Sequence, residues 1–427
     1  MRLKNRQNSY RMFTYSMHIQ YAVLNMHTYN AIVSTMKRTY IRRQIEPLLL
    51  KAAKQFPAIV LTGPRQTGKS TLLQHIFSTH HYVTMDDPVI RKICIDDPAL
   101  FLETNPAPCI IDEVQYVPAL LSYIKIQIDK NRNLTGQYIL TGSQIFPLMK
   151  GLTESLAGRI AIFELQGLSL DELPEKDKNI QKLFERIFTG TYPDPSIHKV
   201  DRRLFYSSYL QTYLERDIRQ IQNVQDLSQF HHFLELLAGR AGNLLNLSEI
   251  SKELGISQPT VKRWLSLLEN TRIIYLLRPY FKNLNKRIVK SPKLYFMDTG
   301  LLSYLLNYPD SRTLCSGPAN GAVLENFLVS EVIKKKINNN ISAELFFYRD
   351  SNRNEIDLII DQGYKQILCE IKLNKNISKK HYGQLLRLQS LFTNPALLLV
   401  SAYEKEIHLT KEVKNLPLWD IPELFEE

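Results

Sequence analysis

The sequence predicts an α/β protein that has a parallel-sheet domain near its amino terminus, a mainly helical middle region and a second α/β domain at its carboxyl terminus. Within residues 57–165, five short apolar runs alternate with helical patterns, which is typical of a parallel sheet covered by helices. Charged, loop-like residues 171–186 then lead into apolar residues at helical spacing. Two further apolar runs, within 353–360 and 366–372, predict neighbouring strands near the end of the chain.

Length, charge and cysteine use limit the classes of protein that fit. The chain has 427 residues, enough for two to four domains, and a formal net charge of +12 that suits a nucleic-acid partner, DNA in preference to RNA. Its four cysteines lack C-x-x-C spacing and indicate buried thiols in a reducing compartment, so we expect a cytoplasmic protein. The sequence lacks a run of eighteen apolar residues, which excludes a membrane helix.

The predicted domains are residues 36–175, 176–310 and 311–427. Residues 1–35 are set apart because they carry four basic residues and no acidic one, without an amphipathic period. We interpret them as a disordered extension or as a start codon chosen too early, with Met36 as the natural start. An organelle transit peptide is a further alternative.

The strands of the first domain are expected in the five apolar runs. Four of these runs lead into polar or glycine-rich turns, and parallel sheets bind ligands at the carboxyl ends of their strands. The runs are Ala58–Leu61, His81–Met85, Pro108–Ile111, Gln137–Leu140 and Ile160–Leu165.

The turn after the first run fits the pattern G-x-x-x-x-G-K-[ST] at every fixed position. The glycines let backbone N–H groups wrap phosphates, the lysine neutralises the outer phosphates, and the serine hydroxyl can hold Mg²⁺. An accidental match is the alternative, but a strand before the turn and a helical pattern after it are the surroundings that a P-loop requires. We predict that ATP and Mg²⁺ are bound by Gly63, Pro64, Arg65, Gln66, Thr67, Gly68, Lys69, Ser70 and Thr71.

Two carboxylates follow the third run. We expect Asp112 to reach Mg²⁺ together with Ser70, and Glu113 to act as the general base for water, which would indicate ATP hydrolysis. The fourth run ends in Thr-Gly-Ser, so Ser143 is placed to sense the γ-phosphate. The alternative is that Asp-Glu only opens a helix, where acidic residues are favoured.

One arginine precedes the fifth run. Arg159 could stabilise phosphate charge in its own chain or across a subunit boundary, which would require a homo-oligomer. A surface arginine in a loop is the alternative.

Residues 247–265 predict a helix, a glycine turn and a second helix. Ser248 and Ser257 can cap the helices, Gly255 supplies the turn, and Pro259 is tolerated in a first helical turn. Residues 273–277 and 293–297 could then form the strands of a wing. If this winged helix docks on DNA, the contacts would come from Gln258 and Thr260 near base edges and from Lys262 and Arg263 at phosphates. A lid or a protein-contact module is the alternative.

The third domain carries a second chemical pattern. Asp357 and Glu370-x-Lys372 lie on successive predicted strands, and Glu325 lies on a predicted helix before them. Adjacent strands can bring Asp357 and Glu370 together as Mg²⁺ ligands, while Lys372 shares a face with Glu370. This is the spacing of the PD-(D/E)XK nuclease core. A solvated strand face is the alternative, and active cleavage is a separate question from the fold.

From about Met36 onward the chain resembles prokaryotic AAA-type ATPases that end in a domain of unknown function with a restriction-endonuclease-like core. The resemblance implies an ATP-binding protein and leaves its substrate open. It rests on residues 61–70, 111–115, 140–143, 212–218, 293–300, 355–357 and 370–372.

Two functions are compatible with these patterns. The first is Mg²⁺-dependent ATP hydrolysis that couples nucleotide state to a nucleic-acid-binding or nuclease-like carboxyl-terminal region. The alternative is a slow, switch-like regulator or partner-assembly protein that binds nucleic acid without cutting it.

Overall fold

A computed structural model describes residues 39–143, 156–173, 178–214, 227–280 and 290–425. Its contacts divide the chain into Met1–Tyr40 and Ile41–Glu427, and every element below belongs to the second unit. The predicted extension 1–35 lies outside the described residues.

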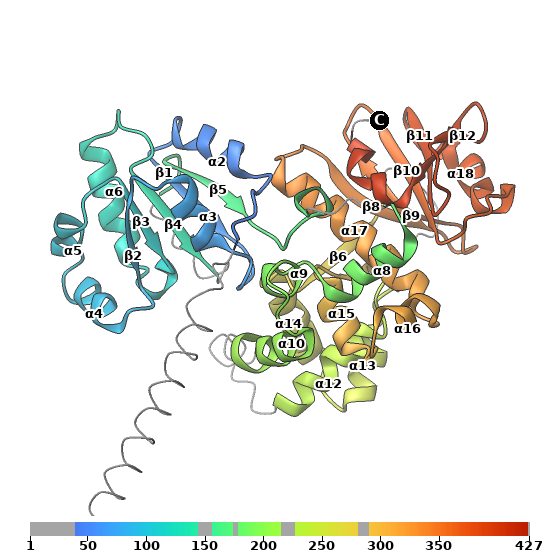
Figure 1. The fold of residues 1–427 in the computed structure, drawn as a ribbon, viewed down its shortest axis with the longest axis horizontal. Helices are drawn as coiled ribbons and strands as arrows, with labels where there is room; N and C mark the ends of the chain where they lie inside the picture. The colour runs from blue at the N-terminus through green and yellow to red at the C-terminus, as the bar shows by residue number, and fades with distance from the viewer. Residues whose placement is uncertain (1–38, 144–155, 174–177, 215–226, 281–289, 426–427) are drawn as a thin grey trace, which may run out of the picture. The chain divides into compact units, whose positions relative to one another are not determined.

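The first sheet has five parallel strands in the order β2-β3-β4-β1-β5 (Figure 1). All five predicted strands are confirmed. Because the strands are parallel, the residues that follow β1, β3 and β4 meet at one edge of the sheet. The strands are β1 (Ala58–Thr62), β2 (His81–Thr84), β3 (Cys109–Asp112), β4 (Tyr138–Gly142) and β5 (Ile160–Glu164).

The helices around this sheet explain why the sequences of its central strands are mostly apolar without alternation. Every residue of β1, β3 and β4 is buried, as expected for strands covered on both faces. Asp87 and Asp97 cap two of the helices, each followed by a proline in the first turn. The helices of this part are α2 (Glu46–Ala53), α3 (Lys69–Ile76), α4 (Pro88–Asp96), α5 (Pro98–Thr104) and α6 (Leu120–Lys130).

The middle region is helical, as predicted. Its described helices are α8 (Ile180–Thr189), α9 (Pro193–Ser196), α10 (Arg202–Tyr209), α12 (Leu227–Ala238), α13 (Leu247–Leu254) and α14 (Gln258–Asn270), with a π-helical turn, η3, at Leu210–Leu214.

The predicted helix–turn–helix is α13 and α14. Gly255 has a φ of 64°, and the Ser257 side chain accepts from the backbone N–H of Thr260. The predicted cap at Ser248 is wrong. Helix α13 begins at Leu247, so Asn246 is the residue that precedes it, and its side chain accepts the N–H groups of Ser248 and Glu249.

The second sheet is mixed, with strand order β12-β13-β11-β10-β9-β8-β6-β7. The two predicted wing strands pair with each other antiparallel, and β6 also pairs with β8. The sheet therefore crosses the domain boundary predicted at residue 310. Its strands are β6 (Ile274–Pro279), β7 (Lys293–Phe296), β8 (Glu344–Arg349), β9 (Glu355–Asp361), β10 (Gln366–Lys372), β11 (Pro395–Ser401), β12 (Ile407–His408) and β13 (Val413–Pro417).

The α-helices described after β7 are α15 (Thr299–Leu305), α16 (Ser311–Ser316), α17 (Asn320–Asn338) and α18 (Gly383–Leu388). Helix α17 is nineteen residues long, and most of its residues from Val323 to Lys334 are buried. None of the helices in the described ranges combines the length and apolar character that a membrane span needs.

The fold predicts how the helical core responds to truncation. Leu237 on α12 is fully buried, whereas Leu204 on α10 is 69% exposed. Leu237→Ala should lower the free energy of unfolding by about 2–5 kcal/mol, because it removes buried apolar contacts and leaves a cavity. Leu204→Ala, the matched control, should change it by no more than about 0.5 kcal/mol. Urea unfolding measures both, and equal effects would contradict this packing.

Candidate functional site

The loop between β1 and α3 is shaped by two glycines with positive φ. Gly63 has a φ of 134°, and a Cβ there would lie 2.1 Å from the carbonyl oxygen of Leu165, so no other residue fits. Gly68 has a φ of 88° and directly precedes α3. The loop therefore ends at a helix amino terminus, whose free N–H groups and dipole favour a phosphate.

Lys69 lies inside this loop and is buried. Its ammonium donates to the carbonyl oxygens of Gly63 (3.0 Å) and Pro64 (2.8 Å). The Thr67 hydroxyl also donates to the carbonyl oxygen of Pro64, at 2.9 Å. The ammonium is thus held within the loop that the motif assigns to phosphates.

Asp112 collects hydroxyl donors from three elements. The Ser70 hydroxyl lies 2.9 and 3.0 Å from its two carboxylate oxygens, and the Tyr82 phenol donates at 2.8 Å. The Thr141 hydroxyl also donates to it. Burial and the charge of Asp112 raise the pKa of Tyr82, which keeps the phenol a donor. The pairing of Ser70 with Asp112 fits a Mg²⁺ site, because both supply hard oxygen ligands.

Glu113 adopts the left-handed region, with a φ of 55°. This conformation costs about 1–3 kcal/mol in a residue other than glycine. The Ser143 hydroxyl donates to its carboxylate at 3.0 Å, and the Gln115 amide also donates to it. The structure thus brings the predicted base and the predicted γ-phosphate sensor into direct contact.

Arg159 is not at this site. In the parallel pairing of β1 with β5, Ala58 lies opposite Ile160 and Thr62 opposite Glu164. Arg159 therefore lies beside the amino end of β1, about 20 Å from Gly63 at 3.3 Å per residue. Its guanidinium pairs with Asp129 at 2.8 Å. The predicted role within its own chain is wrong, and the role across a subunit boundary stays a prediction.

Sequence reasoning missed Arg43, which is buried beside the phosphate loop. Its guanidinium donates to the carbonyl oxygens of Thr67 and Gln166, both at 2.8 Å, and lies 3.1 Å from the Glu172 carboxylate. It therefore ties the loop to the segment after β5. Arg43 precedes Thr67 by 24 residues and belongs to no motif, so the sequence carries no signal for this contact.

The same segment reaches the carboxyl-terminal part of the chain. The backbone N–H of Leu170 donates to Glu331 on α17 at 2.7 Å. Lys334, one turn later, contacts the carbonyl oxygen of Leu168 at 3.2 Å and pairs with Glu331 at 2.8 Å. A buried polar chain thus runs from the phosphate loop through Arg43 to α17.

The second predicted cluster also forms. Asp357 on β9 and Glu370 on β10 share a hydrogen bond, and the Lys372 ammonium lies 3.3 Å from Asp357 and 2.7 Å from Glu370. Burial and the charge of Asp357 raise the pKa of Glu370 to about 9. Burial opposes ionisation of Asp357, but Lys372 and Lys293 hold its pKa below the usual value. The two pKa shifts therefore run in opposite directions and favour the ionised form at Asp357 over the ionised form at Glu370.

Glu325 on α17 joins this cluster through a residue that the sequence did not single out. The ammonium of Lys293, on β7, lies 3.1 Å from Glu325 and 2.6 Å from Glu355. The Tyr295 phenol donates to the same Glu325 oxygen at 2.6 Å, and Arg349 pairs with Glu355 at 3.2 Å. Within the described ranges, no group of three or more His, Cys, Asp or Glu side chains is placed to hold a metal ion.

The predicted nucleic-acid contacts lie on one helix. Gln258, Lys262 and Arg263 are exposed on α14, while Thr260 is partly buried and hydrogen-bonds to the cap at Ser257. The opposite face of α14 is buried. The Arg263 guanidinium donates to the Thr260 hydroxyl at 3.4 Å, so the predicted contacts lie together on the exposed face of α14.

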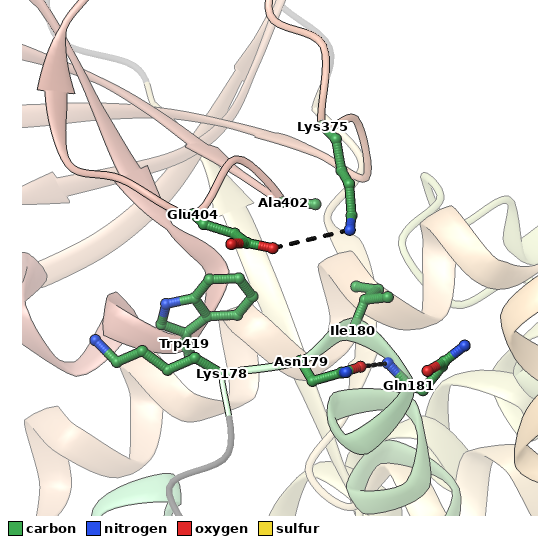
Figure 2. Close-up of a pocket in the computed structure, with 8 residues that line it drawn as sticks. All are labelled: Lys178, Asn179, Ile180, Gln181, Lys375, Ala402, Glu404 and Trp419. Atoms are coloured by element: carbon green, nitrogen blue, oxygen red, sulfur yellow. Dashed lines mark hydrogen bonds and ion pairs between the residues drawn. The ribbon is translucent and has the colours of Figure 1, made fainter.

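A cavity of about 130 Å³ lies where the start of α8 meets the carboxyl-terminal domain (Figure 2). Lys375 and Glu404 face each other across it at 3.9 Å. Its lining contains no predicted site residue: it consists of Lys178, Asn179, Ile180, Gln181, Lys375, Ala402, Glu404 and Trp419.

Three family models match successive parts of the chain. A family model described as an AAA domain matches residues 55–174, which contain the phosphate loop, Asp112 and Glu113. This part of the chain is therefore similar to AAA domains. Two models of domains of unknown function, DUF8612 and DUF4143, match residues 180–312 and 320–421. Neither assigns an activity, so the nuclease-like core stays a prediction.

Relatives of similar length are also found. The chain is 29% identical over 354 residues to the uncharacterized protein Rv2008c of Mycobacterium tuberculosis, covering 82% of this chain and 78% of that protein. An uncharacterized protein of Haemophilus influenzae is 24% identical over 309 residues, covering 65% of this chain and 74% of that protein. Among solved structures, the Walker-type ATPase PABY2304 of Pyrococcus abyssi has a TM-score of 0.41 and 15% identity, covering 63% of this chain and 97% of that chain.

The buried position of Arg43 gives a prediction with a neighbouring control. Arg43→Met should lower the free energy of unfolding by about 3–5 kcal/mol, because it leaves the buried Glu172 carboxylate without its cationic partner. Arg42 has a side chain that is 82% exposed, and Arg42→Met should be close to neutral. Urea unfolding of both variants tests this. A neutral Arg43→Met would show that the guanidinium does not secure the loop.

Proposed function

We propose that this chain binds Mg-ATP in the loop 63–70 and hydrolyses it. One observation carries the proposal: the ends of β1, β3 and β4 bring the loop ammonium of Lys69, the Ser70–Asp112 pair and the Glu113–Ser143 pair to one edge of the sheet. Phosphate binding, metal binding and water activation need these groups side by side.

Each residue then has a defined task. Lys69 and the loop N–H groups hold the phosphates, and Ser70 and Asp112 hold Mg²⁺, which when bound would neutralise charge on the phosphate oxygens. Glu113 accepts a proton from the attacking water, and Ser143 fixes its carboxylate and senses the terminal phosphate. Gln115 supplies a buried side-chain oxygen that has no hydrogen-bond partner among the described residues, and it would accept from that water.

We further propose that nucleotide state is coupled to the carboxyl-terminal region through the buried polar chain. Arg43 binds the loop carbonyl at Thr67, and the segment that it also binds contacts Glu331 and Lys334 on α17. The same helix carries Glu325 of the second cluster. A shift of the loop on nucleotide binding would therefore be transmitted through these contacts to α17.

For the region after residue 176 we propose binding of nucleic acid, DNA in preference to RNA, without cleavage. Support comes from the exposed Gln258, Lys262 and Arg263 on α14 and from the net charge of +12 that the whole chain carries. A nuclease-like core is supported by the meeting of Asp357, Glu370 and Lys372. Cleavage is left out of the proposal, because the Lys372 ammonium already pairs with these carboxylates.

Two substitutions test ATP hydrolysis. Lys69→Ala should abolish ATP binding, whereas Glu113→Gln should bind ATP normally and hydrolyse it about 10²–10⁴-fold more slowly, because only the general base is lost. Calorimetry with Mg-ATP and steady-state phosphate release measure the two properties. Lys54→Ala and Glu103→Gln, at exposed positions, are the controls. Wild-type turnover in Glu113→Gln would remove Glu113 from the mechanism.

A charge-matched pair of variants tests the nucleic-acid contact. Lys262→Ala/Arg263→Ala should weaken binding to a random-sequence DNA duplex and reduce the slope of log affinity against log salt by about two, because two phosphate contacts are lost. Lys130→Ala/Arg132→Ala removes the same charge from exposed positions of the ATPase domain. Equal loss in both double variants would show that only net charge matters, and no binding by the wild type would exclude the contact.

A further inference from the structure

The second cluster, which contains Glu325, Glu355, Asp357 and Glu370, also contains the ammonium of Lys293. This lysine comes from another part of the chain. It lies on β7, in the region that matches DUF8612, whereas the carboxylates that it pairs with lie in the region that matches DUF4143. Its side chain is only 3% exposed. Its ammonium bridges Glu325 of α17 and Glu355 of β9, at 3.1 and 2.6 Å.

This ammonium is held in place by its backbone and by its neighbours. Lys293 pairs with Leu277 in the β6–β7 ladder and forms a bridge with Leu244 on its other side. Tyr295, on the same face of β7, donates to the Glu325 oxygen that Lys293 contacts. The ring of Phe347 lies 5.7 Å from the ammonium and covers it with apolar surface. A long, flexible side chain is thereby fixed in one position.

The charges of the cluster are then balanced within the chain. Lys293 faces Glu325 and Glu355, Lys372 faces Asp357 and Glu370, and Arg349 faces Glu355. Buried carboxylates need such partners, because desolvation of an unpaired charge costs several kcal/mol. A divalent cation binds tightly only where carboxylates carry charge that is not already compensated.

We propose that Lys293 is the resident cation of this cluster and excludes a divalent metal ion from it. Its ammonium takes the place between the α17 glutamate and the strand carboxylates that a metal ion would otherwise occupy. The cluster binds a divalent cation only when Lys293 is withdrawn or replaced. This inference goes beyond ATP hydrolysis and does not depend on it, since it concerns the other sheet.

Calorimetric titration of the full chain with MnCl₂, in the absence of nucleotide, tests the proposal. Lys293→Met should bind Mn²⁺ at least about tenfold more tightly than the wild type, because it leaves carboxylates uncompensated. Lys290→Met, at an exposed position, removes the same charge and should behave like the wild type. Adding Glu325→Gln to Lys293→Met should abolish the new site, which separates it from any Mn²⁺ bound at Asp112.

A second variant covers the case in which Lys293→Met does not fold. Lys293→Met/Glu355→Gln removes one charge of each sign, so the cluster keeps its net charge while Glu325 loses its ammonium partner. It should also gain a Mn²⁺ site and be stabilised by Mn²⁺ in thermal unfolding. The proposal is overturned if the folded variants bind Mn²⁺ no better than Lys290→Met. It is also overturned if the wild type binds Mn²⁺ and loses that site on Glu325→Gln.

Discussion

The parallel alignment of β1, β3 and β4 is the constraint on which the candidate ATPase site depends. A parallel sheet puts the residues that follow its strands at one edge and those that precede them at the other. The phosphate loop, the Asp112–Glu113 pair and Ser143 all follow strands, and they meet. No single motif creates this site; strand order and direction bring together three short segments that are far apart in sequence.

Both the cluster around Asp112 and the cluster around Asp357 and Glu370 contain buried carboxylates, and the two clusters stabilise this negative charge in different ways. At the candidate ATPase site, Asp112 is buried among hydroxyl donors, which leave its negative charge available to a cation. In the carboxyl-terminal cluster the carboxylates face ammonium groups of the same chain, so their charge is compensated. The first arrangement suits a site that takes up Mg²⁺ with a nucleotide, and the second suits a site that is already complete.

The sequence predicted the parts of the fold that depend on local chemistry. The five strands, the turn at Gly255 and the cap at Ser257 follow from periodicity and side-chain type, and the structure confirms them. The position of Arg159 could have been predicted from the sequence. Arg159 precedes a strand, and in a parallel sheet the residues that precede strands lie at the edge opposite the phosphate loop. Strand direction alone excludes Arg159 from the phosphate loop of its own chain.

Other features could not be predicted from one sequence. Arg43, Tyr82 and Lys293 contact their partners across 24, 30 and 32 residues, and these contacts exist only after the elements pack. Their side chains carry no motif, and a buried arginine or lysine is rare enough that burial would not be assigned from composition. These contacts depend on tertiary packing, which the local sequence pattern does not show.

Hydrogen exchange with and without Mg²⁺ and a non-hydrolysable ATP analogue tests the central claim most directly. We predict slower hydrogen exchange with Mg²⁺ and the analogue in peptides that cover residues 63–71 and 112–116, because loop N–H groups would bind phosphates and Asp112 would bind the metal ion. The amino end of β5, near Arg159, should not change. Unaltered exchange at residues 63–71, at saturating analogue and in folded protein, would contradict the assignment of this loop.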